Sequence, residues 1–146
     1  MRSRILQSLL LLTSLLLSAI AVADTKEFGD YTVHYLAVNS TFLTPEIPEQ
    51  YGIVRSRRSA FINISVLHNN DDGSTTAVPA MVAGGKYNLI QRSTIEFNEI
   101  REGDAIYYIG EFDFSNAEKL RFNIDVQPEH QGKVYQLEWQ TQLYAE

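Results

Sequence analysis

The sequence predicts an all-β protein in which two antiparallel sheets pack face to face. Three observations lead to this prediction. After residue 30, apolar and polar residues alternate with a period of two almost everywhere, as they do in strands that bury one face. Turn-forming residues recur at the spacing expected of sandwiches and barrels. No segment predicts a helix longer than a turn or two.

Seven segments predict strands, and turn residues bound most of them. In chain order they are residues 31–38, 60–68, 76–83, 89–100, 105–113, 119–127 and 134–144. The segment 119–127 is the clearest, because four apolar side chains alternate with polar ones throughout. Phe122 and Trp139 lie on the apolar faces of the last two strands, so we expect both in the core. Pro79 lacks an N–H donor, which predicts an edge strand or a bulge, and Gly84-Gly85-Lys86 predicts a turn.

Seven strands in a chain of this length are typical of an immunoglobulin-like antiparallel β-sandwich. An outer-membrane barrel fits less well, because one face of the best strands is charged and the strand count is odd.

The first 23 residues have the pattern of a secretory signal peptide. Arg2 and Arg4 precede a Leu-rich apolar run, and Ala21-Val22-Ala23 supplies small residues at the cleavage positions. We therefore expect residues 1–23 to be removed and residues 24–146 to form one domain, soluble and located in the periplasm. An uncleaved membrane anchor is the alternative, which the polar residues within the run weaken.

The expected mature chain is acidic and has no cysteine. Removing Arg2 and Arg4 leaves ten basic residues against eighteen acidic ones, a net charge of −8. Such a chain repels phosphate backbones and anionic lipid, so we expect neither nucleic acid nor a membrane surface as a partner. The absence of cysteine excludes disulfides, thiolate catalysis and Cys-ligated metals.

No motif in the sequence predicts catalysis, a cofactor or a metal site. Nucleophile elbow, zinc-protease, Walker and dinucleotide-binding patterns are all absent. His34 and His68 with Asp71 or Asp72 could ligate zinc or copper, but they lack ligand spacing, and solvated side chains are the simpler interpretation. Tyrosines could line a groove for sugar or peptide, although strand packing explains them equally well; these are Tyr31, Tyr35, Tyr107 and Tyr108. We expect a protein that is not an enzyme and holds neither cofactor nor metal.

The stretch TFLTPEIPEQYGIVRSRRSA, residues 41–60, fits neither a strand nor a long helix. Thr44 can cap a short turn that Pro45 starts and Gly52 ends, while Pro48 prevents a longer helix. Connections of about twenty residues are uncommon in compact domains and are often functional. The simpler role is a cover, in which apolar residues pack over an open end of the sandwich; these are Phe42, Leu43, Ile47 and Tyr51.

The segments NSTFLTPE, QYGIVRSRRSAFINISV, AIYYIGEF and LRFNIDVQP resemble the small secreted proteins of domain-of-unknown-function family 4426. The resemblance extends from Gly29 to Tyr144 and implies a periplasmic β-sandwich of Gram-negative bacteria. It implies no catalytic or binding residue, because the family has no established activity.

Three function hypotheses remain. The leading one is a non-enzymatic module that binds another envelope protein through the 41–58 connection and an exposed strand edge near Pro79. In this hypothesis an acidic partner docks on Arg55, Arg57 and Arg58, with Tyr51 and Phe42 beside them. The arginines could instead protect a strand end and form ordinary surface salt bridges. The second hypothesis is a carrier or sensor for a small ligand held between the sheets or under the connection, and the third is an enzyme with an unrecognised site.

Overall fold

The computed structural model describes residues 23–146. The predicted signal peptide, except for Ala23, lies outside the described residues. Within residues 23–146, no helix combines the length and the apolar character that crossing a membrane requires.

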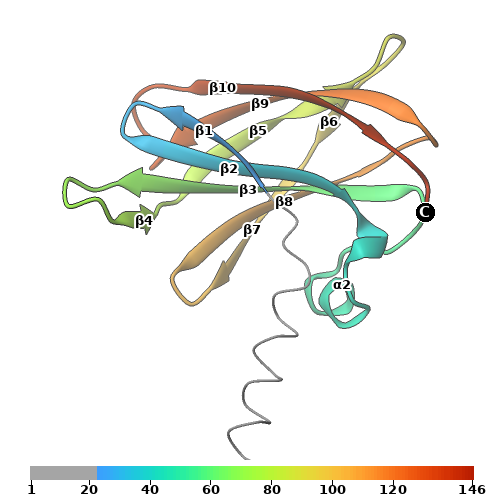
Figure 1. Ribbon diagram of the computed structural model, residues 1–146, viewed down its shortest axis with the longest axis horizontal. Coiled ribbons are helices and arrows are strands. Elements are labelled where there is room, and N and C mark those ends of the chain that lie inside the picture. Colours follow the sequence, from blue (N-terminus) through green and yellow to red (C-terminus); the bar gives the residue numbers. More distant parts are fainter. Residues whose placement is uncertain (1–22) are drawn as a thin grey trace, which may run out of the picture.

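The described chain forms two antiparallel sheets that pack on each other as a sandwich (Figure 1). In chain order the elements are β1 (Asp24–Phe28), β2 (Tyr31–Asn39), the 3-10 helix η1 (Ser40–Phe42), α2 (Glu46–Tyr51), β3 (Ser59–Asn69), β4 (Thr75–Ala77), β5 (Ala80–Tyr87), β6 (Arg92–Ile95), β7 (Phe97–Glu102), β8 (Ala105–Asp113), β9 (Glu118–Pro128) and β10 (Tyr135–Leu143). One sheet has the order β1-β2-β3-β8-β7, with β4 paired to β3, and the other has the order β10-β9-β5-β6. The predicted sandwich is confirmed.

The described residues contain ten strands where the sequence predicted about seven. β1 has an almost fully exposed side-chain pattern, so it carries no alternation that could reveal it. The predicted strand 76–83 divides at Val78 and Pro79, where the chain passes from β4 in the six-stranded sheet to β5 in the four-stranded sheet. The predicted strand 89–100 divides likewise at Glu96, between β6 and β7.

The prediction of a turn at Gly84-Gly85 is wrong, because both glycines lie inside β5. The backbones of neighbouring strands approach them too closely for a side chain. A Cβ on Gly84 would lie 2.1 Å from the carbonyl oxygen of Asn123, and a Cβ on Gly85 would lie 2.3 Å from that of Ser93. These glycines therefore reflect a close backbone contact within a sheet.

Aromatic side chains from both sheets fill the core near its centre. Phe122 is fully buried, and its ring contacts those of Phe112 and Trp139 at centroid distances of 5.2 and 4.7 Å. Trp139 is partly buried and also packs on Tyr35 across the sandwich. The predicted core positions of Phe122 and Trp139 are confirmed.

Candidate functional site

The 41–58 connection leaves the six-stranded sheet after β2 and returns to it at β3, at the end of the sandwich where the C-terminus lies (Figure 1). A buried serine joins its two ends. The Ser40 hydroxyl donates a hydrogen bond of 3.0 Å to the carbonyl oxygen of Ser56 and accepts one of 2.9 Å from the Ser56 N–H. Ser40 is fully buried and Ser56 is partly buried, so the hydroxyl group of Ser40 is shielded from water. These two hydrogen bonds hold the beginning and the end of the connection together, at a point that we call its neck.

A chain of hydroxyl groups extends this anchor to β8. Ser56 Oγ donates to Ser59 Oγ at 2.9 Å, and Ser59 Oγ donates to Asp113 Oδ1 at 3.1 Å. The Phe114 N–H then donates to the carbonyl oxygen of Arg58 at 2.9 Å. The end of the connection is thus tied to the neighbouring strand as well as to its own beginning.

Within the connection, α2 is a helix of six residues between Pro45 and Gly52. Pro45 is the N-cap, and Thr44 contributes only its carbonyl oxygen, which accepts from the Ile47 N–H at 3.1 Å. The predicted side-chain cap by Thr44 is therefore wrong. The predicted end is confirmed, because Gly52 adopts a left-handed φ of 68° that favours glycine and closes the helix onto Pro48.

The connection exposes apolar side chains that the cover interpretation would bury. Phe42 is 71% exposed, Val54 is 61% exposed and Ile47 is 39% exposed. Leu43 and Tyr51 are half-buried. The cover interpretation therefore holds in part for Leu43 and Tyr51 but is wrong for Phe42 and Ile47. Exposed large apolar side chains gathered in one segment are a common feature of binding surfaces.

The three arginines of this segment differ in role. The Arg55 guanidinium donates through Nε to the carbonyl oxygen of Leu43 at 3.1 Å and through Nη2 to that of Thr41 at 3.3 Å. Arg55 therefore braces the connection internally. Arg57 and Arg58 are exposed central residues of a turn, which the Ser59 N–H closes onto Ser56 at 3.3 Å.

Carboxylates near the arginines take part in other contacts. Glu111 accepts a hydrogen bond from the Val54 N–H at 2.6 Å, and Asp113 accepts from Ser59. Within residues 23–146, the ion pair that forms joins Arg101 to Glu99 at 2.8 Å, both on the edge strand β7. The alternative prediction, in which the arginines of the connection form surface salt bridges, is therefore wrong for the described residues.

The tyrosines proposed to line a groove lie in separate environments. Tyr108 is buried, and its hydroxyl accepts from the Ala80 N–H at 2.8 Å; burial raises its pKa. Tyr31 donates to the Glu129 carboxylate, and this hydrogen bond raises the pKa of Tyr31 to about 12. Tyr35 packs on Trp139. These three tyrosines therefore serve packing and local hydrogen bonding.

The histidines and acidic residues named from the sequence also lie apart. His34 faces Ser65 on β3, whereas His68 forms a hydrogen bond of 3.0 Å with Asn70. Asp72 accepts from the Ser74 N–H and hydroxyl, which holds its pKa below the usual value. Within residues 23–146, no three His, Asp or Glu side chains gather as metal ligands.

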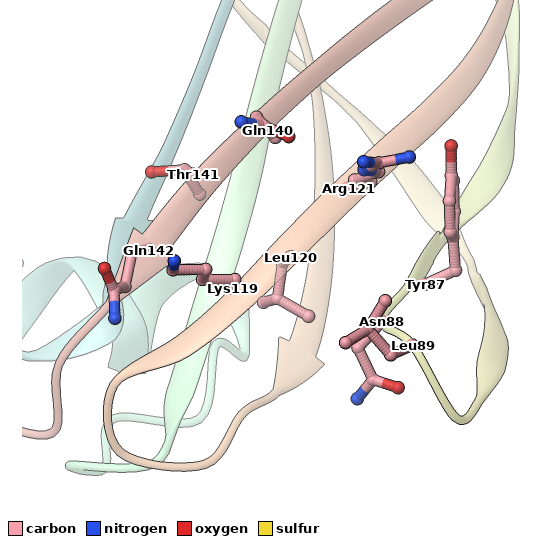
Figure 2. A pocket seen from close by; sticks show the side chains of 9 residues that line it. All are labelled: Tyr87, Asn88, Leu89, Lys119, Leu120, Arg121, Gln140, Thr141 and Gln142. Atoms are coloured by element: carbon pink, nitrogen blue, oxygen red, sulfur yellow. The ribbon is translucent and has the colours of Figure 1, made fainter.

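Residues 23–146 also form two adjoining hollows on the outer face of the four-stranded sheet, which sequence reasoning missed. The first encloses about 390 Å³ and is lined by Tyr87, Asn88, Leu89, Lys119, Leu120, Arg121, Gln140, Thr141 and Gln142 (Figure 2). The second encloses about 300 Å³ and shares Tyr87. The polar alternation of 119–127 and 136–142 predicts this wet face. The position of Tyr87 on this face could not be predicted, because the sequence analysis predicted a turn at Gly84-Gly85 and did not extend the strand to Tyr87.

Comparison with known proteins places the chain in a family. The sequence profile of a domain of unknown function, DUF4426, matches residues 25–146. This chain belongs to the DUF4426 family. The resemblance noted in the sequence is thereby confirmed, and the match covers all ten described strands except the first residue of β1.

Solved structures similar to this DUF4426 protein agree with the sandwich. A DUF4426 family protein from Pseudomonas aeruginosa PAO1 is 27% identical, with a TM-score of 0.75 over 88% of this chain and 99% of that one. FetP from uropathogenic Escherichia coli strain F11, expressed in the periplasm of E. coli, is 9% identical, with a TM-score of 0.57 over 84% of this chain and 94% of its own. A copper-bound variant of FetP is 6% identical, with a TM-score of 0.54 over 85% and 91%. The two FetP structures share the fold alone. No curated protein matches the chain.

Proposed function

We propose that this chain is a non-enzymatic periplasmic protein that binds an acidic surface of another envelope protein through the 41–58 connection. The observation that carries the proposal is the exposure of Phe42 and Val54 on a segment whose two ends are tied together by a buried serine. Aromatic and aliphatic anchors at the centre of an interface commonly supply most of its binding free energy.

The connection is organised before any partner arrives. Ser40 closes its neck, and Arg55 holds the carbonyl groups of Thr41 and Leu43 from the opposite side. A segment already held in its binding conformation loses little conformational entropy on association. The exposed apolar side chains of this segment can therefore contact a partner at little cost in conformational entropy.

The positive charge of the 41–58 connection indicates that the partner surface is negatively charged. Arg57 and Arg58 are exposed side by side in a turn, on a chain whose net charge is −8 after loss of the predicted signal peptide. A local positive potential on an acidic protein orients an approaching acidic surface and speeds association. The partner surface should therefore combine carboxylates with an apolar pocket for Phe42.

The periplasmic location rests on the signal-peptide pattern of residues 1–23. FetP, which shares the fold, was recombinantly expressed in the periplasm of E. coli, which is compatible with the proposed compartment. Intact-mass measurement on the protein from cell envelopes tests the location. A mature chain that begins at Asp24 supports it, and a membrane-retained chain with Met1 contradicts it.

The binding proposal is tested by crosslinking in intact envelopes of the source bacterium, followed by mass spectrometry of the captured protein. The test variants are Phe42→Ser with Val54→Ser, and Arg57→Gln with Arg58→Gln. Each has a matched control on the four-stranded sheet side. Leu89→Ser with Ile90→Ser removes two apolar side chains that are even more exposed, and Lys119→Gln with Arg121→Gln removes two exposed charges.

We expect both 41–58 variants to keep the melting temperature of the parent and to lose one specific crosslinked partner. Both control variants should retain that partner. Capture by the parent should weaken as salt is raised. At 0.1 M salt, interactions between exposed charges are largely screened beyond about 10 Å, and this distance shortens at higher salt. Undiminished capture by the folded Phe42 and Val54 double variant would exclude the 41–58 connection as the binding surface.

A further inference from the structure

Tyr87, the last residue of β5, lies on the outer face of the four-stranded sheet and lines both hollows. Strand register places Arg92 of β6 opposite Tyr87, Tyr87 opposite Arg121 of β9, and Arg121 opposite Gln140 of β10. Directly opposed residues point to the same face of a sheet. A tyrosine ring is thus flanked by two guanidinium groups, and Arg92 lies over it at 5.3 Å from the ring centroid.

Beside Tyr87, the second hollow is lined at Gly84 and Gly85, two positions without side chains. Gly85 is opposite Asn123 on one side and Thr94 on the other, and a side chain there would collide with the backbone of β6. Gly85 therefore lets the backbone of β6 lie close to β5 here, and both hollows include Tyr87 in their lining. The two hollows therefore form one shallow strip across the sheet, with Tyr87 between them.

The turn between β5 and β6 forms a fixed rim of the first hollow. The Asn88 carboxamide oxygen accepts from the N–H groups of Ile90 and Gln91 at 2.9 and 2.8 Å, and its Nδ2 donates to Glu118 at 2.6 Å. Partial burial disfavours the charged form of Glu118, but hydrogen bonds from Ser115 and Asn88 hold its pKa below the usual value. The turn that carries the fully exposed Leu89 is therefore anchored to the start of β9.

The first hollow is positively charged. Lys119 and Arg121, both exposed, line it together with Gln140 and Gln142, and none of the described residues that line it is acidic. Figure 2 shows these four side chains on β9 and β10, with Tyr87 and the β5–β6 turn on the other side. The second hollow is closer to neutral, because Arg92 is accompanied by Asp125.

We propose that this strip binds an acidic oligosaccharide. A carboxylate of the sugar pairs with Lys119 and Arg121, a ring packs on Tyr87, and a neutral unit lies in the second hollow. Guanidinium and ammonium groups bind carboxylates through charge-assisted hydrogen bonds, and a tyrosine ring provides a flat apolar surface for the C–H face of a sugar. The amide groups of Gln140, Gln142 and Asn123 offer both donors and acceptors, which hydroxyl groups require.

The shape of the strip favours an extended polar ligand over an enclosed apolar one. Sites for compact apolar ligands are deep and mostly apolar, and they bury most of the ligand. Here both hollows are open to solvent. Most of the exposed surface of the first hollow is apolar, but seven of its nine lining residues also carry polar side-chain groups, and the surface of the second is about evenly polar and apolar. The binding surface is also distinct from the 41–58 connection, so this inference does not depend on the proposed protein partner.

The test is a titration of the ¹⁵N-labelled protein with trigalacturonate, followed by amide chemical shifts. Maltotriose is the neutral control of the same length. We expect trigalacturonate to shift the amide signals of Tyr87, Lys119 and Arg121, with little effect on residues 41–58. Maltotriose should bind at least about tenfold more weakly, because a hydrogen bond to a charged group contributes roughly 1.5–3 kcal/mol.

Variants distinguish the strip from general charge attraction. Lys119→Gln with Arg121→Gln should weaken trigalacturonate binding about tenfold or more, whereas Arg57→Gln with Arg58→Gln, which removes the same charge elsewhere, should leave it unchanged. Tyr87→Ala should weaken binding of both sugars.

Three outcomes would overturn the inference. The first is the absence of shifts at millimolar trigalacturonate. The second is equal weakening by the two double variants. The third is a response of the Leu89 and Ile90 amides to vesicles of phosphatidylglycerol without any response to the sugar, which would identify the exposed turn as a lipid contact.

Discussion

Replacement of Ser40 by alanine should loosen the 41–58 connection and destabilise the whole domain. The side chain is fully buried and forms two hydrogen bonds with Ser56, one as donor and one as acceptor. Alanine removes both bonds and leaves a carbonyl oxygen and an N–H of Ser56 without their partner. A buried hydrogen bond contributes about 1 kcal/mol net, and an orphaned buried group costs about 1–3 kcal/mol, so we expect a loss of about 2–3 kcal/mol in the free energy of unfolding.

Urea unfolding measures this loss, and it is a large fraction of the roughly 5–15 kcal/mol that stabilises a domain. Ser74→Ala is the matched control, because Ser74 is exposed and its hydroxyl bonds only within a hairpin loop. It should change stability by less than about 0.5–1 kcal/mol. Hydrogen exchange at the Ser56 amide should accelerate in Ser40→Ala and stay slow in the control. An unchanged urea midpoint together with a protected Ser56 amide would refute the account of the serine anchor.

Three further predictions concern the core, a titrating pair and a backbone contact. Phe122→Ala should lower the free energy of unfolding by about 3–5 kcal/mol, because the ring is fully buried among aromatic neighbours, and urea unfolding measures it; a parental midpoint would contradict the register of β9. In ultraviolet titration of tyrosinate, the ionisation near pH 12 should move toward 10 in Glu129→Ala, because the carboxylate that accepts from Tyr31 is removed. Because the pKa of Tyr31 is raised in the folded state, this pair stabilises the fold below pH 10, and the contribution is lost as the pH rises through about 12. A tyrosinate titration identical to that of the parent would exclude the bond. Gly84→Ala should destabilise by at least about 1–3 kcal/mol, because its Cβ would collide with the Asn123 carbonyl oxygen, and an unchanged melting temperature would contradict that contact.

Local alternation was enough to predict the strands that bury one face. The range Ala105–Asp113 of β8 agrees with its prediction at both ends, and β9 differs by one residue at each end. Each of these strands has one buried face and one solvent-exposed face, so every second residue must be apolar. The resulting pattern can be recognised from neighbouring residues in the sequence alone. The same reasoning located the 41–58 connection, because a long stretch without either period stands out among alternating segments.

The features of the candidate sites depend on residues far apart in the chain, so only the tertiary structure decided them. Phe42 and Leu43 are adjacent apolar residues, yet one is exposed and the other half-buried, because burial depends on what the fold brings opposite each side chain. Gly84-Gly85 has the composition of a turn, but it lies in a strand because the neighbouring backbones leave no room for a Cβ. Arg92, Tyr87 and Arg121 become one row only through the pairing of three strands. A strand's period determines which face a residue occupies, whereas the partner across the sheet is determined by register and by the order of strands, which no single segment encodes.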